Sequence, residues 1–296
     1  MYPAEFEYFA PTSVDDALAL LATYGDDAKI LAGGQSLLPM MKLRIAGPKY
    51  LVDVNRIPGL GGIRDEDGWL VCGALTRHAE IAASPVVAAR LPLMRDAARL
   101  TADVQVRNRG TIGGSLAHAD PGGDWPAALM ALDAVVEVTG LTGRRTVPLR
   151  DFLVDAYTTV LGPGDMLTAV RIPLPAPGSG GAYVKFEKRA GDFAVASVGV
   201  QLRLEAGRVV AVAIALGSLG PTPLRAGAAE TVLAGHPVDE ARLREAAALV
   251  SEAAQPFDDT RGSVEYKRHL AGVLLQRAFA VAVDRAGGIA RDTLHV

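Results

Sequence analysis

The sequence predicts an α+β protein with more than one domain, and three observations lead to this prediction. In the first half, a helical pattern is followed by short apolar segments that end in glycine turns. In the second half, three strand-like segments precede two alanine-rich helical segments. Between them, the stretch PLPAPGSGG at 173–181 has the proline, glycine and serine content of a linker. We therefore place a domain boundary near residue 177.

The first half is predicted to begin with a helix that is followed by strands. Ser13 and Asp16 form a capping-box pattern, and apolar residues then recur at helical spacing as far as Tyr24 and Gly25. Short apolar runs bounded by turn residues predict strands, and a run rich in Ala, Leu and Arg predicts a second helix. These further elements are strands at 28–32, 50–54 and 69–73, and a helix at 87–100.

The segment at 101–126 differs from its neighbours. It shows no sustained periodicity, contains five glycines and is polar, so we interpret it as a binding loop. Regular structure resumes after it, and the C-terminal strands stand at separations that suit hairpins. The predicted elements are strands at 134–139, 166–172, 183–189, 195–205 and 209–216, and helices at 239–254 and 263–286.

Composition and charge exclude several classes of protein. The chain of 296 residues is 50% hydrophobic, which excludes intrinsic disorder. Its 30 Lys plus Arg against 33 Asp plus Glu leave a net charge of −3, so we expect no nucleic-acid partner. The longest uncharged run, 209–224, is broken by glycine and proline and is shorter than the roughly 20 residues of a membrane span. No membrane span is therefore expected.

The cysteine and histidine content limits the metal chemistry. Cys72 is the single cysteine, so this chain cannot supply the thiolates of an iron–sulfur cluster. It is most simply a small buried apolar residue. The five histidines have no metal-ligand spacing, and we predict no protein-held metal. The acidic first sixteen residues are unlike a signal peptide, so we expect a cytoplasmic protein.

The segment KILAGGQSLLP at 29–39 is the first with chemical information. A strand enters the pair Gly33 and Gly34, and Ser36 follows with a hydroxyl group. Glycines allow positive φ and close approach of the backbone, so that successive amides can converge on a phosphate. The alternative is an ordinary turn that ends a strand, and for this motif alone that alternative is favoured.

A second segment, RGTIGGSLAHADPGGD at 109–124, repeats the pattern with Gly113, Gly114 and Ser115. Two loops that face one cleft would suit the diphosphate of a dinucleotide. The sequence has no GxxxxGK[ST] motif, and no GxGxxG stands between a strand and a helix with an acidic residue at the required spacing. The Walker and Rossmann modes of binding are therefore disfavoured.

Together, AGGQSLLP at 32–39 and TIGGSLAHADPGGD at 111–124 resemble the FAD-binding medium subunits of the aerobic molybdenum hydroxylases, a family that includes carbon monoxide dehydrogenase and the xanthine dehydrogenase flavin domain. MKLR at 41–44, VRIP at 170–173 and YVKFEKRAGDFA at 183–194 support the resemblance, which spans nearly the whole chain. It implies a two-subdomain FAD-binding region of the vanillyl-alcohol-oxidase/PCMH type, with subdomains at about 1–57 and 58–176. A C-terminal domain at 177–296, with a three-stranded antiparallel sheet and helices, would follow.

The resemblance also implies a function. Substrate would be oxidised at a molybdenum cofactor in a large subunit, and electrons would cross the [2Fe–2S] clusters of a small subunit. This chain would pass them through FAD to an external acceptor, in a complex expected to be a dimer of heterotrimers. No catalytic acid or base is then required of this chain. A self-sufficient FAD-dependent oxidoreductase and a phosphate-binding protein without redox chemistry remain as alternatives.

The cofactor-binding residues that the resemblance implies fall into three groups. The first loop would bind the diphosphate through backbone amides, the second would hold it from the opposite side, and a third group would contact other parts of FAD. Phe193, where some relatives have tyrosine, would cover the isoalloxazine ring. The residues are Lys29, Leu31, Ala32, Gly33, Gly34, Gln35, Ser36 and Leu37 in the first group, Thr111, Ile112, Gly113, Gly114 and Ser115 in the second, and Asp124, Leu167, Lys185 and Phe193 in the third.

Three other features have competing interpretations. His118 near Asp120 could serve as an acid–base group, but a structural hydrogen bond or a place beside a ligand is favoured. Lys185 lies in a predicted strand and points either to solvent or to a cleft. Trp125 and the alanines that follow it are expected to pack in the core.

Overall fold

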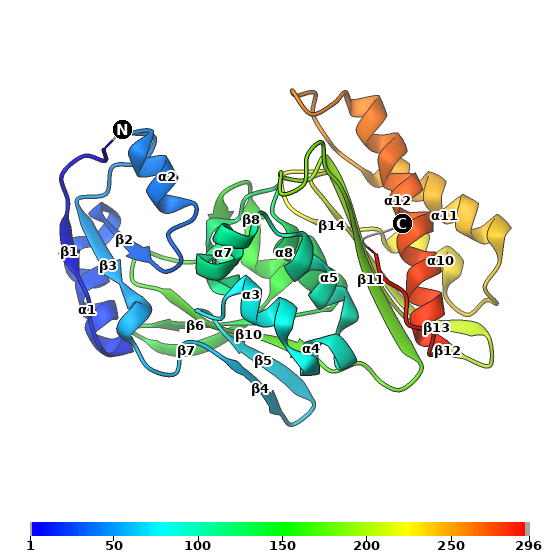
Figure 1. Cartoon of the computed structure of the whole chain (residues 1–296), viewed down its shortest axis with the longest axis horizontal. Coiled ribbons are helices and arrows are strands. Elements are labelled where there is room, and N and C mark those ends of the chain that lie inside the picture. Colours follow the sequence, from blue (N-terminus) through cyan, green and yellow to red (C-terminus); the bar gives the residue numbers. More distant parts are fainter. Residues whose placement is uncertain (1, 294–296) are drawn as a thin grey trace.

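The computed structural model describes residues 2–293, which form three consecutive units along the long axis of the molecule (Figure 1). The N-terminal unit is blue in the figure, the central unit runs from cyan to green, and the C-terminal unit extends to red. Each unit has its own sheet, and helices cover the sheets. The α+β prediction is confirmed.

The N-terminal unit is a three-stranded parallel sheet in the order β1-β3-β2. As predicted, Ser13 caps the first helix by accepting a hydrogen bond from the amide of Asp16, and Gly25 ends the helix with φ of +53°. Ala17, Leu18 and Leu21 face the sheet from one side of this helix. The elements are β1 Glu7–Phe9, α1 Val14–Tyr24, η1 Gly25–Asp27, β2 Ala28–Leu31, α2 Leu37–Lys42, β3 Tyr50–Asp53 and η2 Val54–Arg56.

The central unit has a five-stranded antiparallel sheet in the order β4-β5-β10-β6-β7, with short helices packed on it. Cys72 is fully buried on β5, and burial raises the pKa of its thiol to about 12. The strands of this sheet are β4 Ile63–Glu66, β5 Trp69–Gly73, β6 Val135–Gly140, β7 Gly143–Pro148 and β10 Met166–Pro173, and β8 Leu153–Asp155 and β9 Thr158–Thr159 pair as a separate two-stranded sheet. The helices are α3 His78–Ala83, α4 Pro85–Arg90, α5 Pro92–Leu100, α6 Val104–Arg109, α7 Ile112–His118, α8 Asp124–Ala131 and α9 Leu149–Phe152.

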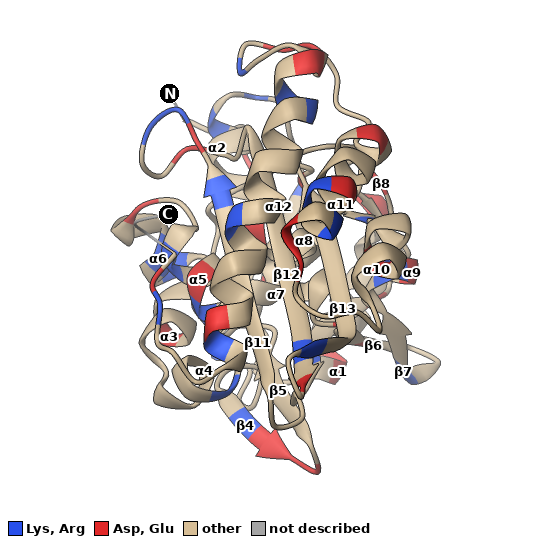
Figure 2. Ribbon diagram, turned by 90° about the vertical axis from the view of Figure 1, so that its right-hand side faces the viewer, with Lys and Arg blue, Asp and Glu red and all other residues tan. Residues whose placement is uncertain are grey.

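The C-terminal unit is an antiparallel sheet between two layers of helices. Its three long strands match the prediction, and a two-residue strand at the edge adds a fourth. Helix α12 covers one face, whereas α5 and α8 of the central unit pack on the other (Figures 1 and 2). The elements are β11 Ser179–Phe186, β12 Ala196–Glu205, β13 Arg208–Gly217, β14 Leu224–Arg225, α10 Gly227–Leu233, α11 Glu240–Ala253 and α12 Val264–Ala286.

Two element predictions are wrong in detail. The helix predicted at 87–100 is divided into α4 and α5 at Leu91, because Pro92 lacks an amide hydrogen and restricts the residue before it. The predicted linker at 173–181 is shorter than expected, since β11 already begins at Ser179.

The segment predicted as a loop at 101–126 holds α6, α7 and the start of α8. Asp103 and Thr111 cap the first two of these helices with their side chains. Every residue of α8 is buried, including Trp125, so this helix has no polar face that would reveal a helical period. The polar, glycine-rich sequence of this segment therefore predicted a loop where the structure has short helices.

Charged side chains of both signs are dispersed over the outer elements. Figure 2 shows Lys and Arg next to Asp and Glu along α11, α12 and β4. This pattern agrees with the small net charge of the sequence. Within residues 2–293, no helix combines the length and the apolar character that crossing a bilayer requires.

Candidate functional site

A cavity of about 1110 Å³ lies where the N-terminal and central units meet, and it extends to residues 191–193. This volume is slightly above the usual range of about 300–1000 Å³ for small-molecule and cofactor sites. Most of the cofactor-binding residues predicted from the sequence line the cavity: Lys29, Ala32, Gly33, Gly34, Gln35, Ser36, Leu37, Thr111, Gly113, Gly114, Ser115, Asp124, Leu167 and Phe193. Leu31, Ile112 and Lys185 are not part of its lining.

The two glycine segments touch each other at one wall of this cavity. A Cβ atom added to Gly33 would lie 2.4 Å from the backbone oxygen of Arg109 and 2.8 Å from Cα of Gly110. Gly34 instead has φ of +73°, the left-handed region that favours glycine. The first glycine thus permits close approach of the backbones, and the second permits the turn.

The first segment offers a row of free backbone amides. Within residues 2–293, no protein group accepts a hydrogen bond from the amides of residues 33–37. The next amide, that of Leu38, is bonded to the oxygen of Gly34 inside the first turn of α2. The side chain of Ser36 does not cap this helix, so its hydroxyl is also available. Consecutive free amides of this kind form an anion-binding concavity.

The second segment uses its amides within the protein. Gly113 donates to the oxygen of Ala74, and Ile112 donates to that of Thr76. Gly114 donates to Oγ1 of Thr111, while Ser115 donates to the Thr111 oxygen. The two segments are therefore not equivalent cradles, although their sequences are alike. Because Thr111 caps α7, the first amides of this helix are not available to a ligand. The second segment instead contributes glycine backbone and the Ser115 side chain to the cavity wall.

A pair of side chains that the sequence analysis did not single out joins the two segments. Asn55 donates through Nδ2 to the oxygen of Ala32 at 2.8 Å, and its Oδ1 accepts from Arg77 at 2.6 Å. The other terminal nitrogen of Arg77 donates to the backbone oxygen of Arg109. We call Asn55 and Arg77 the loop clamp. Its members lie far apart in the sequence, and no local motif marks them.

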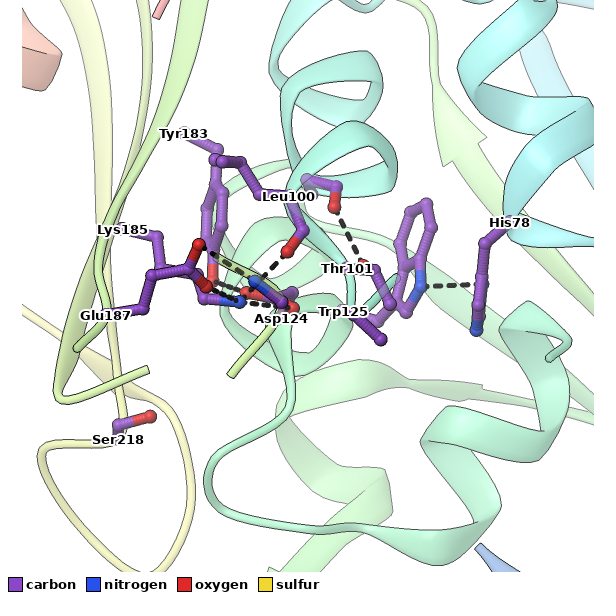
Figure 3. A network of polar contacts seen from close by, with 12 residues as sticks. His78, Leu100, Thr101, Asp124, Trp125, Tyr183, Lys185, Glu187 and Ser218 are labelled. Carbon is purple, nitrogen blue, oxygen red and sulfur yellow. Dashed lines mark hydrogen bonds and ion pairs between the residues drawn. The ribbon is translucent and has the colours of Figure 1, made fainter. Parts of the chain in front are cut away.

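Lys185 and Asp124 belong to a buried polar network between the central and C-terminal units (Figure 3). The ammonium group of Lys185 lies 3.3 Å from Asp124 and 3.0 Å from Glu187, and it donates to the oxygen of Leu100. Tyr183 donates its hydroxyl to Asp124 at 2.9 Å. The Lys185 side chain is 1% exposed, so it points neither to solvent nor into the cavity. The network holds α8 against β11.

Burial raises the pKa of Asp124 to about 6, although Lys185 and Tyr183 both favour its charged form. The folded chain therefore binds this proton more tightly than the unfolded chain, whose carboxyl has the ordinary value of 3.8. The stability contributed by Asp124 consequently falls as the pH rises through this interval.

We predict that urea unfolding of the wild type and the Asp124→Asn variant will show this dependence. Between about pH 4 and about pH 7, the wild type should lose about 2 kcal/mol of unfolding free energy relative to the variant. A difference that does not change with pH would contradict the assignment.

Aromatic and polar side chains surround another part of the cavity. The Phe193 ring is 49% exposed, and the Arg261 guanidinium lies 5.7 Å from its centre. Nε2 of His118 is 3.9 Å from Asp120, and its ring is 5.3 Å from that of Tyr157. Phe193 is therefore available to cover a planar ligand, and His118 borders the cavity. Within residues 2–293, no group of three or more His, Cys, Asp or Glu side chains could hold a metal ion.

Two protein families match consecutive parts of the chain. Residues 4–175 match the FAD binding domain in molybdopterin dehydrogenase, and residues 181–282 match the CO dehydrogenase flavoprotein C-terminal domain. The carbon monoxide dehydrogenase medium chain of Hydrogenophaga pseudoflava is 45% identical over 96% of this chain and 99% of its own length. Subunit alpha of the 6-hydroxypseudooxynicotine dehydrogenase complex of Paenarthrobacter nicotinovorans is 39% identical, with 97% of both chains covered.

Solved structures agree with these matches. A chain of carbon monoxide dehydrogenase from Hydrogenophaga pseudoflava superimposes with a TM-score of 0.94 and 47% identity, covering 96% of this chain and 99% of that one. Quinoline 2-oxidoreductase from Pseudomonas putida 86 gives a TM-score of 0.91 and 36% identity, covering 97% and 99%. The relatives are subunits of dehydrogenases and hydroxylases. This chain belongs to the family of FAD-binding medium subunits of the molybdenum hydroxylases, and it is an oxidoreductase subunit.

Proposed function

We propose that this chain binds FAD in the cavity between its N-terminal and central units and works as the electron-transfer subunit of a molybdenum hydroxylase complex. It would take electrons from the [2Fe–2S] clusters of a small subunit and deliver them to an external acceptor. Substrate would be oxidised in a large subunit that holds the molybdenum cofactor. The observation that carries this proposal is the row of free amides at 33–37, packed directly against the second glycine segment.

The residues of the cavity fit a dinucleotide. The free amides at 33–37 and the Ser36 hydroxyl would hold the diphosphate through neutral donors. Residues 111–115 would form the opposite wall, and Lys29 and Leu31 would flank the first turn. Phe193 would cover the isoalloxazine ring. Leu167 would contact the cofactor from β10.

In this proposal, the side chains of Asp124 and Lys185 support the site indirectly and do not contact FAD. Asp124 reaches the cavity wall, but its carboxylate is held by Tyr183 and Lys185. Lys185 therefore acts on the site through Asp124, by fixing the start of α8 beside the cavity. FAD, when bound, supplies the redox chemistry, and the chain supplies position and shields the site from water.

We further propose the arrangement of domains and subunits. An FAD-binding region at 1–176, with subdomains at 1–57 and 58–176, would precede a C-terminal domain at 177–296, and the family matches at 4–175 and 181–282 support this division. The names of relatives in multisubunit dehydrogenases support a complex with large and small subunits. We propose a dimer of heterotrimers.

Reconstitution of the complex tests this function. The purified chain should bind one equivalent of FAD, seen as the visible absorption band of oxidised flavin, and should show no substrate oxidation alone. Addition of the large and small subunits should produce substrate-dependent bleaching of that band. A chain that oxidises substrate without partners would support a self-sufficient oxidoreductase instead, and a chain that binds no flavin would refute both.

A further inference from the structure

The side chain of His78 is a buried polar group at the cavity, and it lies outside the two glycine segments and the network around Asp124. It is 4% exposed, begins α3, and lines the cavity next to the second glycine segment. Its backbone amide donates to the oxygen of Gly110 at 3.1 Å. A Cβ atom added to Gly110 would lie 2.8 Å from Nε2 of His78, so this nitrogen faces the point where the two glycine segments meet.

The protonation state of His78 follows from its neighbour. Nε1 of Trp125 lies 2.9 Å from Nδ1 of His78 (Figure 3). An indole nitrogen can only donate, so Nδ1 must be unprotonated and the hydrogen of the neutral ring must be on Nε2. Burial, together with the charges of Arg77 and Arg107, lowers the pKa of His78 to about 4. The ring is therefore neutral at physiological pH.

The hydrogen on Nε2 has no acceptor in the protein. Within residues 2–293, no group accepts a hydrogen bond from this nitrogen. The atom is also not fully enclosed by protein, so a ligand or water in the cavity can reach it. A buried donor with one orientation, whose partner is missing from the protein, requires an acceptor from a ligand or water. Because Trp125 is fully buried, its hydrogen bond to Nδ1 fixes the orientation of the His78 ring.

We propose that His78 is a cofactor-binding residue whose Nε2–H donates to an oxygen in the diphosphate–ribityl part of bound FAD. This inference rests on the proposed location of FAD in the cavity. His78 lies beside the contact between Gly33 and Gly110, next to the first of the free amides. Like those amides, it is a neutral donor with a fixed direction. Trp125 is its positioning residue, since the indole determines which nitrogen carries the hydrogen.

Two substitutions at His78 distinguish the effect of its hydrogen bond with Trp125 from that of its proposed hydrogen bond with FAD. In His78→Asn, the side-chain oxygen can replace Nδ1 as the acceptor for Trp125, but the donor toward the cavity is lost. In His78→Gln, the longer amide can restore a donor near the position of Nε2. We expect the dissociation constant of FAD to rise about 10-fold to 100-fold in His78→Asn and to recover in large part in His78→Gln. FAD titration of the full apo-chain measures both.

An NMR measurement on the wild-type chain tests the proposal without any substitution. With ¹⁵N-labelled histidine, the Nε2–H proton of His78 should move downfield and exchange more slowly with water when FAD is added. An unchanged resonance, or an FAD affinity in His78→Asn equal to that of the wild type, would overturn the role of His78. Wild-type affinity for FAD in a Gly33→Ala variant would instead overturn the location of the cofactor, so the two failures can be distinguished.

Discussion

Substitution of Gly33 is expected to cause a large loss of FAD binding that increases with the size of the new side chain, beginning with alanine. The new Cβ would lie 2.4 Å from the backbone oxygen of Arg109, a distance that no real Cβ contact reaches. Overpacking against backbone costs about 1–3 kcal/mol, so we expect FAD affinity to fall about 10-fold to 100-fold. A valine at this position should abolish retention of FAD during purification.

Gly61→Ala is the matched control for this experiment. Gly61 has no atom within 4 Å of an added Cβ and does not have a positive φ. The variant should therefore bind FAD like the wild type. The Gly33 side chain would push the two segments apart, whereas a Gly114 side chain would meet Oγ1 of Thr111 at 2.7 Å.

Arg77→Ala is expected to have an effect as large as that of Gly33→Ala, because it removes the residue that joins the loop clamp to the second glycine segment. Oδ1 of Asn55 and the backbone oxygen of Arg109 would both lose the donor that Arg77 supplies. Hydrogen bonds to charged groups contribute about 1.5–3 kcal/mol, which corresponds to a loss of FAD affinity of about 10-fold to 100-fold if the clamp holds the site in its binding conformation. Equilibrium titration of the apo-chain with FAD measures this loss.

A double-mutant cycle shows whether the two clamp residues act together. If Asn55 reaches the second segment through Arg77, Asn55→Ala should add little to the defect of Arg77→Ala. Arg95→Ala, which removes an exposed arginine from α5, serves as the control and should leave FAD affinity unchanged. Additive losses from Asn55 and Arg77 would show that the clamp does not operate as one unit.

Local sequence patterns were sufficient for much of the fold and for the position of the site. The Ser13 cap and the glycine after Tyr24 mark both ends of α1, and the alternation of apolar runs with turns marks eight strands of the three larger sheets, β2, β3, β5, β6, β10, β11, β12 and β13. These signals act over a few residues and need no partner from elsewhere in the chain. The glycine pairs are local in the same sense, and the structure brings both to one cavity.

Other features of the site depend on contacts between segments that are distant in the sequence, and only the tertiary structure determines them. Whether an amide in a glycine turn is free at 33–37 or occupied at 112–115 depends on whether another segment supplies an acceptor, as Ala74 and Thr76 do for the second turn. The loop clamp links residues 22 and 32 positions apart. By itself, the sequence identified the two glycine segments that line the cavity. The packing of remote carbonyls and side chains determined which of their donors remain available, because hydrogen bonds are satisfied by neighbours in space.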